Sequence, residues 1–248
     1  MQVNVSAVSY LNAAPFVYGL QQSPHNSLHL SLDVPAICAQ KLLTGEVDIA
    51  LTPVVAIPHI PHYQIITDYC IGAVASVATV CLFSNSPVED LQTIYLDGHS
   101  RTSVQLIRVL AKEYWRITPT FTPLVSAPST ALSNTGYVLI GDKTFGLAQK
   151  FAYTYDLAET WIAHTGLPFV FAAWVARAGV SEEAIDQLSK SLHFGIQRIN
   201  TVIEEQKLKY NGVDVAYYLR NNISYRLDDR KREGMKLFLS KLPAEYQP

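Results

Sequence analysis

The segment Asp97-Gly98-His99-Ser100-Arg101-Thr102-Ser103 brings together residue types that bind small anions. It follows a β-rich run at residues 93–96 and precedes an amphipathic run at residues 104–114, so we expect it to connect a strand to a helix. The first backbone N–H groups of a helix have no partners inside the helix, and the helix dipole places about half a positive charge there. The segment therefore predicts an anion site at a helix start.

The side chains of this segment would add contacts to such a site. The hydroxyls of Ser100, Thr102 and Ser103 are further donors, and Arg101 could hold a carboxylate through two parallel hydrogen bonds. His99 is either a proton donor, a second anion contact or an exposed turn residue. The alternative for the whole segment is a plain helix cap, in which Ser100 or Thr102 accepts a hydrogen bond from the helix start.

Polar and mostly neutral residues also follow the other predicted strands. Such a wall suits an oxygen-rich small anion held by many hydrogen bonds. The sequence has no glycine-rich nucleotide loop, zinc-protease motif or serine-hydrolase elbow, so we expect neither a metal nor a cofactor. Asp142 fits a ligand contact and a hinge hydrogen bond equally well. The candidates at these strand ends are Ser9, Tyr10, Asn12, Thr52, Ser76, Thr79, Gly141 and Asp142.

Composition narrows the class of protein. The chain has 248 residues, of which 49% are hydrophobic and 16% charged, as in ordered globular proteins. Its formal net charge of −2 argues against a nucleic-acid or membrane-surface partner. Cys38, Cys70 and Cys81 lie in apolar runs, which favours buried free thiols in a reducing compartment. Without a signal-peptide pattern or a membrane-spanning run, we expect a cytoplasmic protein, either a monomer or a homodimer.

The order of predicted elements indicates an α/β fold with two lobes. Strand-like and helix-like runs alternate through residues 3–69, which implies a mainly parallel sheet. Two apolar runs, residues 77–83 and 169–175, read as buried strands and enclose a self-contained α/β set. We therefore expect a double crossover, with a ligand cleft between the lobes at the carboxyl ends of strands. The predicted lobes are residues 1–83 with 176–248, and residues 84–175.

The part of the chain after Val180 is predicted to be helical. Ser181, followed by two glutamates, is a good helix start. Near the end of the chain, basic residues alternate with acidic ones, which favours a solvated helix face. These residues are Arg226, Arg230, Lys231 and Arg232 among Asp228, Asp229 and Glu233.

Several blocks of the sequence together resemble one protein family. They are Ser-Tyr-Leu-Asn-Ala-Ala-Pro-Phe at residues 9–16, Leu-Thr-Gly-Glu-Val-Asp-Ile-Ala-Leu-Thr-Pro-Val at residues 43–54, Asp97 with residues 100–103, and residues 141–142 followed by 155–161 and 165–172. In this order and spacing they resemble the menaquinone-biosynthesis proteins of the futalosine route. The resemblance implies a two-lobed fold similar to the type II periplasmic binding proteins. Thr79-Val80, where the family usually has Ser-Val, and His99, where it tends to have a small residue, are local departures.

The opening Tyr10-Leu11-Asn12 resembles the chorismate dehydratase branch of that family. The sister branch makes 1,4-dihydroxy-6-naphthoate and opens with a Ser-Pro-Cys-Pro-Asn-Asp type motif. The resemblance thus implies a lyase that removes water from the dicarboxylate chorismate and gives 3-[(1-carboxyvinyl)oxy]benzoate. The naphthoate synthase, or a non-catalytic protein that binds a small carboxylate, are the alternatives.

The resemblance also implies roles for particular residues. Arg101, Thr102 and Ser103 would hold the ring carboxylate, where negative charge builds up. Asn12 and Tyr10 would orient the hydroxyl or the enolpyruvyl group. Asp142 is the one carboxylate that we consider as a base, and we expect the substrate's own side-chain carboxylate to take the proton instead. The catalytic candidates are Asn12, Arg101 and Asp142, and the substrate-binding candidates are Ser9, Tyr10, Thr52, Ser76, Thr79, Ser100, Thr102, Ser103 and Gly141.

Overall fold

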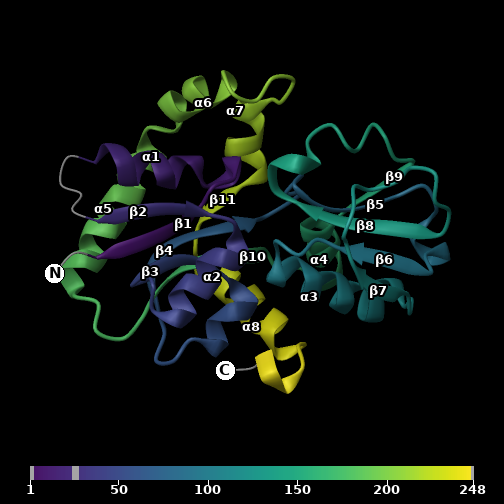
Figure 1. Ribbon diagram of the computed structural model, residues 1–248, viewed down its shortest axis with the longest axis horizontal. Helices are drawn as coiled ribbons and strands as arrows, with labels where there is room; N and C mark the ends of the chain where they lie inside the picture. The colour runs from purple at the N-terminus through teal and green to yellow at the C-terminus, as the bar shows by residue number, and fades with distance from the viewer. Residues whose placement is uncertain (1–2, 24–27, 247–248) are drawn as a thin grey trace.

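The computed structural model describes residues 3–23 and 28–246, whose strands form two separate β-sheets. Sheet A has the strand order β11-β4-β10-β3-β1-β2, and sheet B has the order β7-β6-β8-β5-β9. The sheets lie side by side, each with helices packed on it, so the molecule has two lobes, called lobe A and lobe B after their sheets (Figure 1). Sheet A contains β1 (Asn4–Val8), β2 (His29–Asp33), β3 (Ile49–Pro53), β4 (Gln64–Ala73), β10 (Phe169–Ala176) and β11 (Ser224–Arg226), and sheet B contains β5 (Val80–Ser84), β6 (Thr93–Leu96), β7 (Thr120–Pro123), β8 (Thr135–Ile140) and β9 (Tyr153–Asp156).

Lobe A begins with three parallel strands joined by helices. β1 pairs in parallel with β2 on one side and with β3 on the other. The helix α1 (Ala14–Gln22) follows β1, and α2 (Pro35–Thr44) connects β2 to β3. Proline suits the first turn of α2, and Gly45 ends this helix with a φ of +80°, a left-handed conformation that favours glycine. The predicted β-α-β-α-β order and parallel pairing are confirmed here.

The chain passes from lobe A to lobe B and back, as the predicted double crossover requires. The first passage lies between β4 and β5. The second leads from β9 through α4 (Leu157–Thr165) to β10, which inserts antiparallel between β3 and β4. The boundaries predicted from sequence, at residues 83/84 and 175/176, differ from this arrangement because β5 belongs to sheet B and β10 to sheet A. Both strands are apolar and fully buried, so their composition does not reveal which sheet supplies their hydrogen-bond partners.

Lobe B places the segment 97–103 at the end of β6. This strand pairs in parallel with β7 and β8, and α3 (Arg101–Leu110) starts four residues after it. The helix continues as the π-turn η4 (Ala111–Trp115), close to the predicted helical run. The loop after β8 forms the 3₁₀ turn η5 (Gly141–Thr144). The ends of β6 and β8 therefore lie next to each other and face the same side of sheet B.

The last third of the chain is mainly helical and belongs to lobe A. The predicted helix start at Ser181 is confirmed, because its side chain caps α5 (Glu182–Gln197). This part also contains α6 (Ile199–Lys207), α7 (Val215–Tyr217), the π-turn η6 (Tyr218–Asn222) and α8 (Asp229–Ser240). The predicted solvated face of α8 is wrong at Lys231, whose side chain is only 1% exposed. Its stem packs beside Gly72 of β4, and its Nζ lies 3.2 Å from a carboxylate oxygen of Asp228.

The core joins the two lobes across the crossovers. Trp161 of α4 packs edge-on against Phe169 of β10 and Phe238 of α8, so helices from different parts of the chain meet there.

Cys38, Cys70 and Cys81 are buried and free, as predicted. Among the helices in the described part of the chain, none is both long and apolar enough to cross a bilayer.

Candidate functional site

A small pocket lies between the lobes, where strands of both sheets end. β1 and β3 contribute Val8 and Pro53 at their carboxyl ends, and β8 contributes Ile140 from the other lobe. This is the position predicted for the ligand cleft. Of the predicted residues, Tyr10, Asn12, Ser100, Ser103 and Gly141 line the pocket.

Asn12 lines this pocket and has a polar side-chain atom without a partner in the described part of the chain. It lies in the short turn η1 (Leu11–Ala13) directly after β1. Its Oδ1 atom is buried and has no hydrogen-bond partner within the described residues. Its backbone carbonyl accepts a hydrogen bond of 3.0 Å from the Tyr225 hydroxyl, which holds the turn in place. An unpaired buried acceptor costs about 1–3 kcal/mol, so a group that donates a hydrogen bond to Asn12 would be bound favourably.

The start of α3 forms the opposite wall of the pocket. The Ser100 hydroxyl accepts a hydrogen bond of 3.0 Å from the backbone N–H of Ser103 and donates to the Ser103 hydroxyl at 2.8 Å. Ser100 is therefore the helix cap, and the anion site at this helix start stays a prediction. The Thr102 hydroxyl donates to the carbonyl of Phe171 in β10 and ties α3 to sheet A. Residues Ser100 and Ser103 still line the pocket, although their hydroxyls are already engaged with each other.

Tyr10 and Gly141 bring the two lobes into contact at the edge of the pocket. Gly141 has a φ of +71°, and a Cβ atom at this position would lie 2.7 Å from the Tyr10 ring. Only glycine therefore fits without strain in the backbone and a shift of the Tyr10 ring or of one lobe. The Tyr10 hydroxyl lies 3.1 Å from Nδ1 of His99. Burial, with the nearby charges of Asp97 and Asp142, raises the pKa of Tyr10 to about 12, so this hydroxyl stays protonated at neutral pH.

Asp142 links the lobes instead of lining the pocket. One of its carboxylate oxygens accepts the backbone N–H of Leu11 at 2.9 Å, and the other accepts the Tyr210 hydroxyl at 2.6 Å. Leu11 and Tyr210 belong to lobe A, whereas Asp142 belongs to lobe B. Burial raises the pKa of the Asp142 carboxyl, and the two hydrogen bonds oppose this shift. These contacts favour the hinge hydrogen bond over the ligand contact.

Phe145 extends this connection between the lobes. Its ring packs edge-on against Tyr210 at 6.1 Å and against Tyr218 at 5.3 Å, measured between ring centroids. Two residues of lobe B therefore contact three residues of lobe A through hydrogen bonds and ring packing: Asp142 and Phe145 on one side, and Leu11, Tyr210 and Tyr218 on the other. We call this group of five residues the interlobe clasp.

The other predicted residues lie outside the pocket. Arg101 is exposed and lines a neighbouring recess with Asp97, so the structure does not bring its guanidinium to Asn12. Ser9 is exposed, and the buried Thr52 hydroxyl donates to the carbonyl of Ala50. The two remaining hydroxyls have partners of their own: Ser76 donates to Asp156, and Thr79 bonds the hydroxyl of Tyr218.

Sequence reasoning missed several residues that the structure brings to the site. Tyr210 reaches Asp142 across 68 residues of sequence, and Tyr225 reaches Asn12 across 213. Phe171 of β10 lines the pocket beside the start of α3. No local motif marks these aromatic residues, because their positions depend on how distant segments pack. Within the described residues, no cluster of three histidine, cysteine or acidic side chains is arranged to hold a metal ion.

Comparison with known protein families shows to which family the chain belongs. A family model described as menaquinone biosynthesis matches residues 3–244. The chain belongs to this menaquinone-biosynthesis family. The blocks that carried the resemblance, such as residues 9–16 and 43–54, lie within the matched part. A member from Thermus thermophilus, named chorismate dehydratase, is 26% identical over 261 aligned residues, which cover 96% of this chain and 94% of that protein.

Solved structures agree with the two-lobed architecture. A crystal structure of a protein from Archaeoglobus fulgidus has a TM-score of 0.72 at 14% identity and covers 97% of this chain and 96% of its own. A Candida albicans protein, described as having the generic periplasmic binding protein structural fold, has a TM-score of 0.62 at 11% identity, with coverage of 99% and 93%. At these identities the likeness shows the fold alone. This member of the menaquinone-biosynthesis family therefore has the predicted periplasmic-binding-protein-like fold.

Proposed function

We propose that this chain is a chorismate dehydratase, a lyase that removes water from chorismate and forms 3-[(1-carboxyvinyl)oxy]benzoate. Two facts support the substrate: the family membership and the likeness to a relative of that name over almost the whole chain. The observation that carries the chemistry is the buried, unpaired Oδ1 of Asn12 in the pocket between the lobes.

Asn12 is suited to the hydroxyl that leaves chorismate. Its free acceptor would take a hydrogen bond from the 4-hydroxyl and fix the direction of the C4–O bond. The ring carboxylate would then face the start of α3, where the helix dipole and the N–H groups of the first turn favour negative charge. Arg101 lines the adjoining recess, which shares Ser100 with the pocket, and its positive charge would help to attract a dicarboxylate.

The elimination needs one proton acceptor. The C3–H bond is activated through the conjugated ring carboxylate, and its electron pair becomes the new C3–C4 π bond while the C4–O bond breaks. The proton acceptor passes the C3 proton to the leaving hydroxide, which departs as water, and the ring becomes aromatic. Both oxygens of Asp142 are already hydrogen-bonded, which argues against this residue as the base. The carboxylate of the enolpyruvyl side chain would accept the proton, and the protein would supply the geometry.

Chorismate can enter only when the two lobes move apart, and the lobes then close again over the bound substrate. The open space inside the pocket is about 40 Å³, far below the ~300–1,000 Å³ of typical ligand sites. We take lobe A and lobe B as the moving units and the interlobe clasp as the contact that holds them closed. Closure would exclude water from the reacting atoms. The cytoplasmic location and the choice between monomer and homodimer stay predictions.

The direct test is incubation of the purified protein with chorismate. We expect the diene absorbance to fall while that of an aromatic product rises, with the product identified by mass spectrometry. Turnover of cyclic dehypoxanthine futalosine, with none of chorismate, would assign the protein to the naphthoate branch. Saturable binding of chorismate without any turnover would indicate a binding protein and contradict the proposal.

A further inference from the structure

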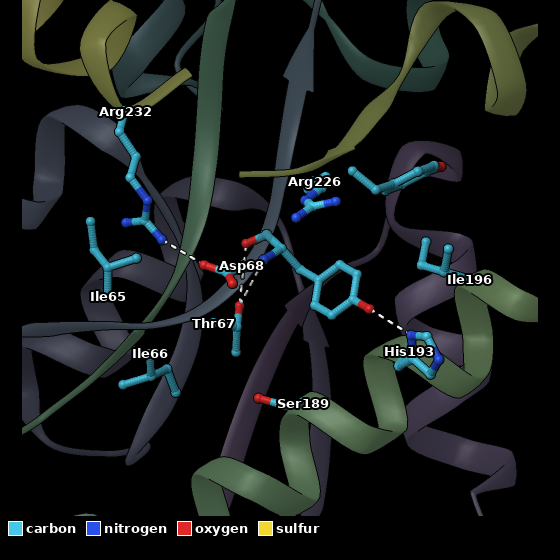
Figure 2. A pocket seen from close by; sticks show the side chains of 11 residues that line it. Ile65, Ile66, Thr67, Asp68, Ser189, His193, Ile196, Arg226 and Arg232 are labelled. Carbon is cyan, nitrogen blue, oxygen red and sulfur yellow. Dashed lines mark hydrogen bonds and ion pairs between the residues drawn. The ribbon is translucent and has the colours of Figure 1, made fainter. Parts of the chain in front are cut away.

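A second and larger recess lies away from the pocket, against β4, β11, α5 and α8. Its volume is about 710 Å³, within the range of typical sites for small ligands. Its residues differ from those that line the pocket between the lobes. Figure 2 shows the recess, with the Asp68–Arg232 pair on one side and His193 of α5 on the other.

The recess contains an exposed arginine, Arg226, without a hydrogen-bonded or ion-paired partner among the described residues, although the charge of Asp228 acts on it from nearby. Figure 2 shows the guanidinium of Arg226 between the Arg232–Asp68 pair and His193. Arg232 is paired with Asp68 at 2.8 Å, whereas Arg226 makes no side-chain hydrogen bond or ion pair within residues 3–23 and 28–246. One positive charge is therefore left over in the recess. A planar guanidinium of this kind binds a carboxylate through two parallel hydrogen bonds.

The remainder of the recess is suited to an apolar body. Ile65 and Ile66 of β4 and Ile196 of α5 line it with partly buried side chains. The ring of Tyr69 adds an aromatic surface, and its hydroxyl lies 2.9 Å from Nδ1 of His193. The recess thus offers a cation, apolar walls and a polar pair.

We propose that this recess binds a small carboxylate with a flat apolar body, held by Arg226 and by the isoleucines of β4 and α5. The proposal goes beyond the reaction between the lobes and does not depend on it. Tyr225 connects the two sites, because it lines the recess while its hydroxyl holds the backbone of Asn12. An occupant would therefore touch a residue that supports the substrate pocket.

Benzoate is the probe, added to the uniformly ¹⁵N-labelled full chain and followed by two-dimensional NMR. We expect saturable shifts at residues 65–69, 193–196 and 226. Benzamide, which has the same shape without the charge, should bind at least about tenfold more weakly. Arg226→Gln should weaken the benzoate shifts at these residues by a similar factor, and Arg226→Lys, which keeps the charge without the planar fork, by less.

The matched control is Arg116→Gln, which removes an exposed arginine of lobe B that has no side-chain partner among the described residues. It should leave the benzoate shifts unchanged. Any benzoate that enters the pocket between the lobes would shift residues 10–12 and 100–103, and Arg226→Gln should not affect those shifts. The proposal is overturned if the recess shows no saturable shifts up to about 20 mM benzoate, a generous limit for a ligand of this size, or if Arg226→Gln leaves them intact.

Discussion

At the scale of single residues, Asn12 and Thr52 illustrate two kinds of buried polar group. Asn12 follows β1 and Thr52 lies near the end of β3, and both were predicted to contact substrate. The Thr52 hydroxyl is satisfied by the carbonyl of Ala50 at 3.1 Å, whereas Oδ1 of Asn12 is buried with no partner in the described chain. A group that the fold leaves unsatisfied is available to a ligand, so the two residues should respond differently to substitution.

Replacing Asn12 with leucine should separate activity from stability. We expect kcat/KM for chorismate to fall about 10²-fold, because the contact that orients the leaving hydroxyl is lost. The free energy of unfolding should stay constant or rise by up to about 1 kcal/mol, since an unpaired acceptor disappears. Steady-state kinetics and urea unfolding measure the two effects.

Thr52→Val provides the comparison for this substitution. It removes a hydroxyl that already has a partner, so we expect about 1 kcal/mol less stability and an unchanged kcat/KM. If both variants lose activity equally, the special role given to Asn12 is incorrect.

The carboxyl of Asp142 should leave a signature in the pH dependence of stability. Burial raises its pKa above the usual 3.8, so the folded protein binds this proton more tightly than the unfolded chain does. The contribution of Asp142 to stability is therefore fully present below pH 3.8 and decreases as the pH rises above that value. The Tm of the wild type minus that of Asp142→Asn should accordingly fall between acidic and neutral pH.

Asp33→Asn should show the opposite trend. Burial also acts on Asp33, but hydrogen bonds from Lys41, Ser6 and Ser31 outweigh it and lower the pKa of this carboxyl. Its contribution to stability is present above the usual pKa and is lost as the pH falls.

Asp142→Asn also tests the mechanism: a loss of several orders of magnitude in kcat, with folding and binding retained, would identify a protein base.

At the scale of elements, the turn η5 carries the contact between Gly141 and Tyr10. Gly141 and Gly146 both follow β8, with φ values of +71° and +75°. A Cβ atom would meet the Tyr10 ring at Gly141 but nothing within 4 Å at Gly146. The two glycines therefore share the same backbone demand and differ in their contact with the other lobe.

Alanine substitutions at these two glycines should separate the two effects. Gly146→Ala should cost about 1–2 kcal/mol of stability through the left-handed backbone alone and leave KM unchanged. Gly141→Ala should cost more and also raise KM for chorismate, because η5 can no longer approach η1. Thermal unfolding and initial rates test this, and equal values of KM for the two variants would show that the Tyr10 contact is irrelevant to closure.

At the scale of the whole molecule, the interlobe clasp sets the balance between open and closed forms. A contact that holds the lobes closed over a bound ligand adds to the apparent affinity for that ligand. Tyr210 stabilises the closed form through Asp142 and does not line the pocket. Removing its hydroxyl should therefore weaken binding while leaving the reacting groups in place.

Tyr210→Phe should raise KM for chorismate about tenfold and change kcat much less, because a hydrogen bond to a charged group is lost from the clasp. X-ray scattering should report a larger radius of gyration for this variant without ligand. Tyr217→Phe is the control, since the Tyr217 side chain is 59% exposed. A large fall in kcat at unchanged KM would mean that Tyr210 takes part in the chemistry itself.

The sequence by itself determined the features that depend on neighbouring residues. The order of strands and helices, the cap at Ser100, the helix end at Gly45 and the polar strand ends all follow from short-range patterns. Parallel strands with short connections bring their carboxyl ends to one edge of a sheet, so the cleft between the lobes was also predictable.

Only the tertiary structure decided which of these residues meet. Segments far apart in the chain decide to which sheet β5 and β10 belong. They also decide which recess Arg101 lines and which groups bond to Asp142. A buried apolar strand has the same composition in either sheet, and a carboxylate accepts hydrogen bonds from any donor within reach. Packing between the lobes is not encoded by any local pattern. It places Asp142, a candidate base, in a contact between the lobes, and it leaves Asn12 in the pocket with an acceptor that is unpaired within the described residues.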